Sequence, residues 1–346
     1  MHYYRFRQII TAALLMSLMI LPGCGLMSDN SDDKDNTPSE TPVIVITSVD
    51  EEEEETAAEP SADIQAEIQT ENQAEPQTES FEEPASEPST TSYENGEPVS
   101  LDMSWEYASF SKINSGSAVF YKATENRKGL TIGVNAGHGT NGGGSVKTYC
   151  HPDMSPKVTG GTTAAGSIEA AAVSGGMSFN NGEKEADVNL RLAGFIRDEL
   201  LRRGYDVLMI RDNEDVQLDN VARTVICNNC ADCHIAIHFD GDGTDSDKGC
   251  FFISVPDGIK GMVPVDRTWQ MSEELGSQIV TALSNHGHKL HSGGSMDIDL
   301  TQTSYSTVPS VDVEYGNQCT DTSDANLMDM AGATADGVEG FFQVAN

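Results

Sequence analysis

Two histidines and three glutamates stand where a folded chain could bring them together. His138 follows the apolar run "LTIGVNAG", His238 ends the run "HIAIH", and Glu314 lies in the run "SVDVEYG". Glu183 and Glu185 precede a long amphipathic segment. Two histidines, a carboxylate and an open position are typical of a catalytic zinc site. A second carboxylate nearby could take a proton from water and pass it to a leaving amine.

Apolar runs alternate with amphipathic segments around these residues. Residues 185–203 carry apolar side chains at helical spacing, and Gly204 follows as a helix stop. Strands are expected at 130–137, 205–211, 234–239, 249–255 and 310–316, and helices at 185–203, 219–231, 265–287 and 324–342. This alternation predicts an α/β fold, a mostly parallel twisted sheet with helices on both faces. Ligands lie beyond the carboxyl ends of such strands, which puts His138, His238 and Glu314 on one rim.

The N-terminal part of the chain differs in composition from the rest. Residues 1–24 combine arginines, a short apolar run and the ending L-P-G-C, which resembles a bacterial lipoprotein signal with Cys24 as the lipidated residue. An ordinary secretory signal is the alternative. Residues 25–100 hold 22 Asp and Glu against one Lys and few large apolar residues, so we expect a disordered acidic linker. We expect residues 101–346 to form a single domain with a sizeable core, outside the cytoplasm, after this tether.

The charge of the chain limits its partners. The formal net charge is −35 at pH 7. No basic stripe is available to neutralise phosphates, so nucleic acid is excluded as a partner.

Six cysteines fall within the predicted domain. The spacing C-x-x-C-H at Cys230–His234 is that of a c-type haem attachment, and a metal or cluster site is a second interpretation. In an exported protein an even number of cysteines favours disulfides instead. The six are Cys150, Cys227, Cys230, Cys233, Cys250 and Cys319.

Four short motifs occur in a fixed order along the domain. "NAGHGT" stands where a known family has Asp-x-Gly-His-Gly-Gly, and "EADVNL" where it has Glu-Lys-Asp-x-Asn-Leu. "AIH" replaces Ser-Ile-His, and "PSVDVEYGN" replaces Pro-Ala-x-Leu-x-Glu-x-Gly-Phe. From about 130 to 342 the chain thus resembles the zinc-dependent N-acetylmuramoyl-L-alanine amidases of the type 3 family, which are bacterial cell-wall hydrolases.

The resemblance implies a function and a set of site residues. His138, Glu185 and His238 would bind one Zn²⁺, and Glu314 would be the catalytic residue. The reaction would be hydrolysis of the amide between N-acetylmuramic acid and L-alanine in peptidoglycan. The partners would be peptidoglycan and, through Cys24, the bacterial cell membrane, in the cell-wall space. A non-catalytic peptidoglycan-binding module and another zinc hydrolase of wall material, a peptidase or deacetylase, are the alternatives.

The chain departs from the family pattern in four places. The family's Arg-Gly before its penultimate strand is absent, and "HKLHSGGSMDIDL" stands there instead. Asn135 replaces an Asp, Asn317 replaces a Phe, and residues 139–182 form a long glycine-rich segment in place of a short link. We expect the long segment to cover the site as a lid or wall. His286, His288 and His291 could form a second metal site, although exposed polar residues are the simpler interpretation.

Overall fold

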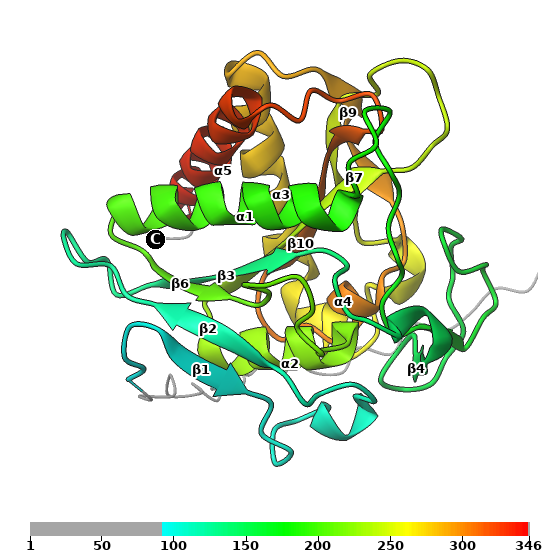
Figure 1. Ribbon diagram of the computed structural model, residues 1–346. Helices are drawn as coiled ribbons and strands as arrows, with labels where there is room; N and C mark the ends of the chain where they lie inside the picture. Colours follow the sequence, from blue (N-terminus) through cyan, green and yellow to red (C-terminus); the bar gives the residue numbers. More distant parts are fainter. Residues whose placement is uncertain (1–91, 345–346) are drawn as a thin grey trace, which may run out of the picture. The chain divides into compact units, whose positions relative to one another are not determined.

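The structure is a computed structural model that describes residues 92–344 (Figure 1). The predicted signal, Cys24 and nearly all of the predicted linker lie outside these residues. None of the described helices is long and apolar enough to span a membrane.

An eight-stranded sheet forms the centre of the domain, in the order β1-β2-β6-β3-β7-β10-β8-β9. The four middle strands β6, β3, β7 and β10 are parallel to one another, and β9 is parallel to β8. The other pairings are antiparallel, namely β1 with β2, β2 with β6 and β8 with β10. The strands are β1 Glu97–Ser100, β2 Ser117–Tyr121, β3 Thr131–Ala136, β6 Asp206–Met209, β7 Cys233–Asp240, β8 Cys250–Ser254, β9 Leu290–Asp297 and β10 Ser310–Asn317. The predicted fold class, a mostly parallel sheet with flanking helices, is confirmed.

Helices cover both faces of the sheet (Figure 1). One face packs on α1, α3 and α5 and the other on α2, because each helix has one apolar side. The helices are α1 Glu185–Arg202, α2 Asn220–Cys230, α3 Val265–Asn285, α4 Thr301–Ser304 and α5 Asp324–Val344. Gly204 ends α1 with a φ of 90°, a conformation that favours glycine. Asp219 caps α2 by accepting a hydrogen bond of 2.8 Å from the backbone nitrogen of Ala222.

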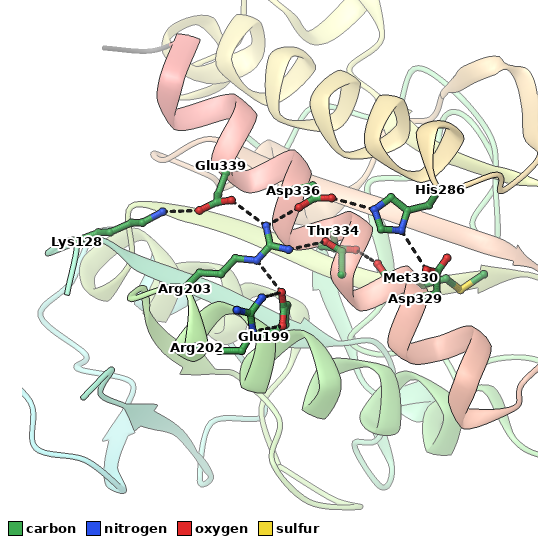
Figure 2. Close-up of polar contacts among 11 residues, drawn as sticks. Lys128, Glu199, Arg202, Arg203, His286, Asp329, Met330, Thr334, Asp336 and Glu339 are labelled. Atoms are coloured by element: carbon green, nitrogen blue, oxygen red, sulfur yellow. Dashed lines mark hydrogen bonds and ion pairs between the residues drawn. The ribbon is translucent and has the colours of Figure 1, made fainter. Parts of the chain in front are cut away.

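A helix-end network of ion pairs joins the C-terminal ends of α1 and α3 to residues within α5 (Figure 2). Arg203, just after α1, bonds Asp336 at 2.6 Å and Glu339 at 2.9 Å, both on α5. His286, just after α3, contacts Asp329 and Asp336 of α5 at 3.1 and 2.9 Å. The network therefore fixes α5 between α1 and α3 on one face of the sheet.

Several elements were not predicted. Strands β1, β2 and β9, helix α4 and a small hairpin of β4 (Lys147–Tyr149) and β5 (Glu169–Ala171) are additional to the expected set. Residues 97–100, assigned to the linker, pair with β2 as an edge strand. The folded part therefore begins before residue 101.

The cysteine predictions are corrected by the structure. All six cysteines of the described residues are free thiols, so the expected disulfides are wrong. Cys227 and Cys233 are fully buried and act as small apolar side chains; the sulfur of Cys227 lies against Gly133 of β3. His234 is also fully buried and contacts Asn135 and Ser310, which leaves no free ring nitrogen for a haem.

Candidate metal centre and active-site pocket

The three side chains predicted to be metal ligands, His138, Glu185 and His238, lie in contact. His138 Nε2 is 2.8 Å from Glu185 Oε1, and His238 Nδ1 is 3.2 Å from both of these atoms. The ligand atoms of these three side chains lie within 4.8 Å of one another, close enough to hold a metal ion. Within residues 92–344 no other group of histidine, cysteine and carboxylate side chains meets this condition. Two imidazole nitrogens and a carboxylate oxygen are ligands that suit Zn²⁺, so the donor set fits the expected metal.

Two buried arginines hold the loop that carries His138. His138 follows β3 with a φ of 64°, an unusual conformation for a side chain of this size. Arg223 of α2 donates to the carbonyls of His138 at 2.6 Å and Ala136 at 3.1 Å. Arg211 donates to the carbonyls of Ala136 and Gly137, each at 3.0 Å. These bonds fix the backbone that presents the imidazole.

Asn135, which replaces the family Asp, supports the His138 loop indirectly, through its hydrogen bond with Arg223. Its Oδ1 accepts from Arg223 at 3.1 Å, and its Nδ2 donates to His234 Nε2 at 3.1 Å. Burial, and then the charge of Arg223, lowers the pKa of His234 to about 3, so this ring is neutral and can accept the bond. An amide fits between an arginine and a neutral histidine because it donates on one side and accepts on the other.

The end of the long insertion (residues 139–182) orients the ligands. The Ser174 carbonyl accepts from His138 Nδ1 at 2.9 Å, which leaves Nε2 free to face Glu185. The backbone nitrogen of Met177 donates to Glu185 Oε2 at 2.8 Å. A Cβ on Gly176 would lie 2.8 Å from His138 and 2.9 Å from Glu185, so only glycine fits there. Sequence reasoning missed these contacts, because carbonyls and glycines in a long loop carry no motif.

The charge of Glu185 is strongly favoured at this position. Burial alone would raise its pKa, but hydrogen bonds and charges from His138 and His238 hold the pKa well below its usual range. Glu183, the other predicted candidate, lies apart and pairs with Arg191 at 2.8 Å. The motif-based choice of Glu185 over Glu183 therefore agrees with the geometry.

Two further carboxylates face the site from β10. Asp312 and Glu314 are two residues apart, so both point to the same side of the strand, and each has a buried oxygen without a hydrogen-bond partner. Burial, and then the charge of Asp312, raises the pKa of Glu314 well above its usual value. Asp312 was not predicted. The signal was present, because Asp312 occupies the leucine position of the Pro-Ala-x-Leu-x-Glu motif.

These residues line a pocket of about 690 Å³. The insertion contributes Lys157, Gly161 and Thr162 to the pocket lining and so forms one wall. The predicted wall is therefore present.

Asp299 fastens this wall to the domain. Its carboxylate, fully buried, accepts from His151 at 2.9 Å and from the backbone nitrogen of Val158 at 2.8 Å, and its own backbone nitrogen donates to Thr159 at 2.7 Å. The Lys157 ammonium donates to the Asp299 carbonyl. One residue thus anchors four residues of the insertion.

A second edge of the pocket is the rim loop, residues 240–249. Asn317, which replaces the family Phe, is fully buried and donates to Asp242 at 3.1 Å and to the Ser246 carbonyl at 2.9 Å. Lys248 pairs with Asp240, a pocket-lining residue, and lies 3.8 Å from Asp242. The departure from Phe to Asn is explained by this loop, which needs a donor beneath it.

The remaining predicted histidines do not form a second metal site. His286 and His288 each contact Asp329, at 3.1 and 3.0 Å, whereas His291 contacts Ser292. These three histidines are not among the grouped metal-ligand side chains of the described residues.

The fold and the cluster are those expected of a metal-dependent hydrolase, and the comparisons specify the class. Residues 132–338 match the family described as N-acetylmuramoyl-L-alanine amidase. The match spans more than half of the chain, so the chain belongs to this family of metal-dependent amidases, which act on peptidoglycan outside the cytoplasm.

Solved structures of similar proteins support the fold. The N-acetylmuramyl-L-alanine amidase Ami1 from Mycobacterium smegmatis has a TM-score of 0.53 and 17% identity, covering 64% of this chain and 100% of its own. Ami1 from Mycobacterium abscessus has a TM-score of 0.51 and 20% identity, covering 62% of this chain and 99% of its own. No curated protein sequence is significantly similar to the chain.

Proposed function

We propose that the protein is a zinc-dependent amidase that hydrolyses the bond between N-acetylmuramic acid and L-alanine in peptidoglycan. His138, Glu185 and His238 hold the metal in this proposal, and Glu314 is the catalytic residue. The observation that carries it is the contact of three ligand side chains in one pocket, beside a buried carboxylate with an unpartnered oxygen.

Each residue has a distinct task in the reaction. Zinc would supply Lewis-acid chemistry, which activates water and polarises an amide carbonyl. Glu314 accepts the proton of the attacking water and returns it to the departing nitrogen of L-alanine, so that the C–N bond breaks to a carboxylate and an amine. The raised pKa of Glu314 suits the second half of this cycle, in which the side chain must hold a proton. The wall and the rim loop restrict how the glycan and peptide enter.

The test is digestion of purified peptidoglycan by the wild-type protein, with products identified by mass spectrometry. We expect stem peptides that begin with L-alanine, lost on chelation and restored by zinc. Glu314→Gln should lower turnover by about 10²–10⁴-fold while bound zinc is retained. Glu183→Gln, outside the pocket, is the matched control. Products that keep L-alanine on the sugar would indicate a peptidase, and equal activity of Glu314→Gln would remove its catalytic role.

We also propose that Cys24 carries a lipid that anchors the enzyme to the cell membrane. The support is the L-P-G-C ending of the signal, which lies outside the described residues. Cys24→Ser should move the protein from the membrane fraction to the medium and abolish labelling by a radioactive fatty acid. A wild-type protein that stays in the membrane fraction but takes up no labelled fatty acid would show that the signal is an uncleaved anchor.

A further inference from the structure

Asp312 adds a carboxylate to the site where the family motif has leucine. The side chain is buried, with 8% of its surface exposed, and lines the pocket. Its Oδ2 lies 3.7 Å from His238 Nε2, and its Oδ1 has no hydrogen-bond partner. A leucine at this position would be an ordinary apolar contact, whereas a buried, unpartnered carboxylate is costly to keep. The residue therefore calls for a specific role.

The imidazole of His238 is held with its two nitrogens facing opposite sides. Nδ1 lies 3.2 Å from both Glu185 Oε1 and His138 Nε2, so it faces the proposed metal. Nε2 faces Asp312. A Cβ on Gly137 would lie 2.2–2.3 Å from Cε1 and Nε2, so the backbone of Gly137 packs directly on the ring. Close packing on one face keeps the ring in this orientation.

A neutral imidazole has a single N–H proton. If Nδ1 donates its lone pair to a metal, this proton must lie on Nε2. Asp312 is the carboxylate on that side of the ring, and a shift of a few tenths of an ångström brings the 3.7 Å separation into hydrogen-bond range. Metal-bound histidines commonly donate their second N–H to a carboxylate or carbonyl, as His138 donates Nδ1–H to the Ser174 carbonyl here.

We propose that Asp312 is a positioning residue of the metal centre, whose carboxylate accepts the Nε2–H of His238 and so presents the Nδ1 lone pair to the metal. The inference rests on the proposed metal site. It gives each histidine an oxygen acceptor behind it, the Ser174 carbonyl for His138 and the Asp312 carboxylate for His238.

The experiment measures zinc affinity of the purified enzyme by competition with a chromophoric chelator, without peptidoglycan. Asp312→Leu removes the acceptor, and zinc should bind about 10–100-fold more weakly. Asp312→Asn keeps an oxygen acceptor without the charge and should show a smaller loss. Glu183→Gln, which removes a carboxylate that pairs with Arg191 outside the pocket, is the matched control and should stay within about twofold of wild type.

A second readout follows the proton directly. The ¹⁵N chemical shifts of the His238 ring in the zinc-loaded enzyme should show the proton on Nε2, and the signal of that proton should broaden through solvent exchange in Asp312→Leu. Because Asp312→Asn is nearly the same size, it keeps the test valid if Asp312→Leu does not fold.

Two results would overturn the inference. Zinc affinity within about twofold of wild type in both variants would show that Asp312 does not support His238. A folded Asp312→Leu protein that binds no zinc at all would show that Asp312 is itself a ligand. Failure of the proposed function looks different, because zinc would then bind wild type normally while no amide was cleaved.

Discussion

At the scale of single residues, the metal centre depends on backbone positions as much as on its ligands. Gly176 lies against His138 and Glu185 with a φ of 79°, whereas the neighbouring Gly175 has open space at its Cβ position. Because the two glycines are adjacent in sequence but differ in their surroundings, an alanine substitution at Gly175 is a matched control for one at Gly176.

Gly176→Ala should weaken zinc binding by about tenfold or more, because the new methyl group would push His138 and Glu185 apart. The positive φ adds a backbone cost of about 1–2 kcal/mol. Gly175→Ala should leave zinc affinity nearly unchanged. Isothermal titration with zinc checks both, and equal effects of the two variants would show that the steric contact at Gly176 is unimportant.

Residue types and motif order were enough to predict that His138, Glu185 and His238 would meet, because each stands at an element end that the sheet brings to one rim. Asp312 could have been found from its place in the motif. Ser174 and Gly176 could not, since their contacts join a loop without periodicity to residues far away in the sequence.

At the scale of elements, the insertion acts as a wall that one buried residue fastens. Asp299→Ala should free residues 150–167 from the domain, since His151 and Val158 lose their common acceptor. Leaving a buried donor of this kind without its acceptor costs about 1–3 kcal/mol. Hydrogen exchange in this segment should become faster while exchange in α1 and β7 stays slow, and KM for peptidoglycan should rise more than kcat falls.

Asp153→Asn is the control for this prediction, because Asp153 is exposed in the same segment and bonds the backbone nitrogen of Ser155. It should change neither exchange nor KM. An Asp299→Ala enzyme with unaltered exchange in residues 150–167 would show that the wall is held by other contacts.

The helix-end network makes stability depend on pH. The hydrogen bond that His286 donates to the Asp336 carboxylate raises the pKa of His286, partial burial opposes this rise, and Asp329 adds to it. A pKa raised by folding stabilises the protein below the unfolded value of about 6.5, and this contribution is lost as pH rises through the folded value. His286→Gln should therefore destabilise the protein more at pH 6 than at pH 9, by less than about 1 kcal/mol at this exposed site.

Urea unfolding of wild type, His286→Gln, Asp336→Asn and the double variant at both pH values checks this prediction. The coupling between the two side chains should be measurable at pH 6 and vanish at pH 9. A larger loss at pH 9 would contradict the direction of the pKa shift.

The elements themselves were largely predictable, for reasons visible in their residues. Buried strands such as β7 are continuous apolar runs, and α1 keeps strict helical spacing from Val188 to Leu200. Strand β9, "LHSGGSMD", has neither pattern, and it is a strand because it pairs with β8. Tertiary pairing decides such segments, so local sequence does not reveal them.

At the scale of the whole molecule, the described domain is held by packing and hydrogen bonds without disulfides. Four of the six thiols are buried, and burial raises the pKa of Cys250 to about 12, which keeps it protonated and unreactive. Cys230 and Cys319 are partly exposed.

In protein purified from residue 25 onward, a thiol reagent should modify Cys319 and Cys230 in the folded state and the other four cysteines only after unfolding. A reducing agent should leave Tm unchanged. Each disulfide lost would instead cost about 2–5 kcal/mol and lower Tm by several degrees, so such a drop would contradict the free-thiol assignment.

The rim loop has a consequence for the surroundings in which the enzyme works. Lys248 pairs with Asp240 and lies 3.8 Å from Asp242, and the amide of Asn317 donates to Asp242 from beneath. Residues 240–249 hold four aspartates and this one lysine, so the loop keeps an excess of negative charge. One edge of the pocket should therefore attract cations from the fluid outside the cell.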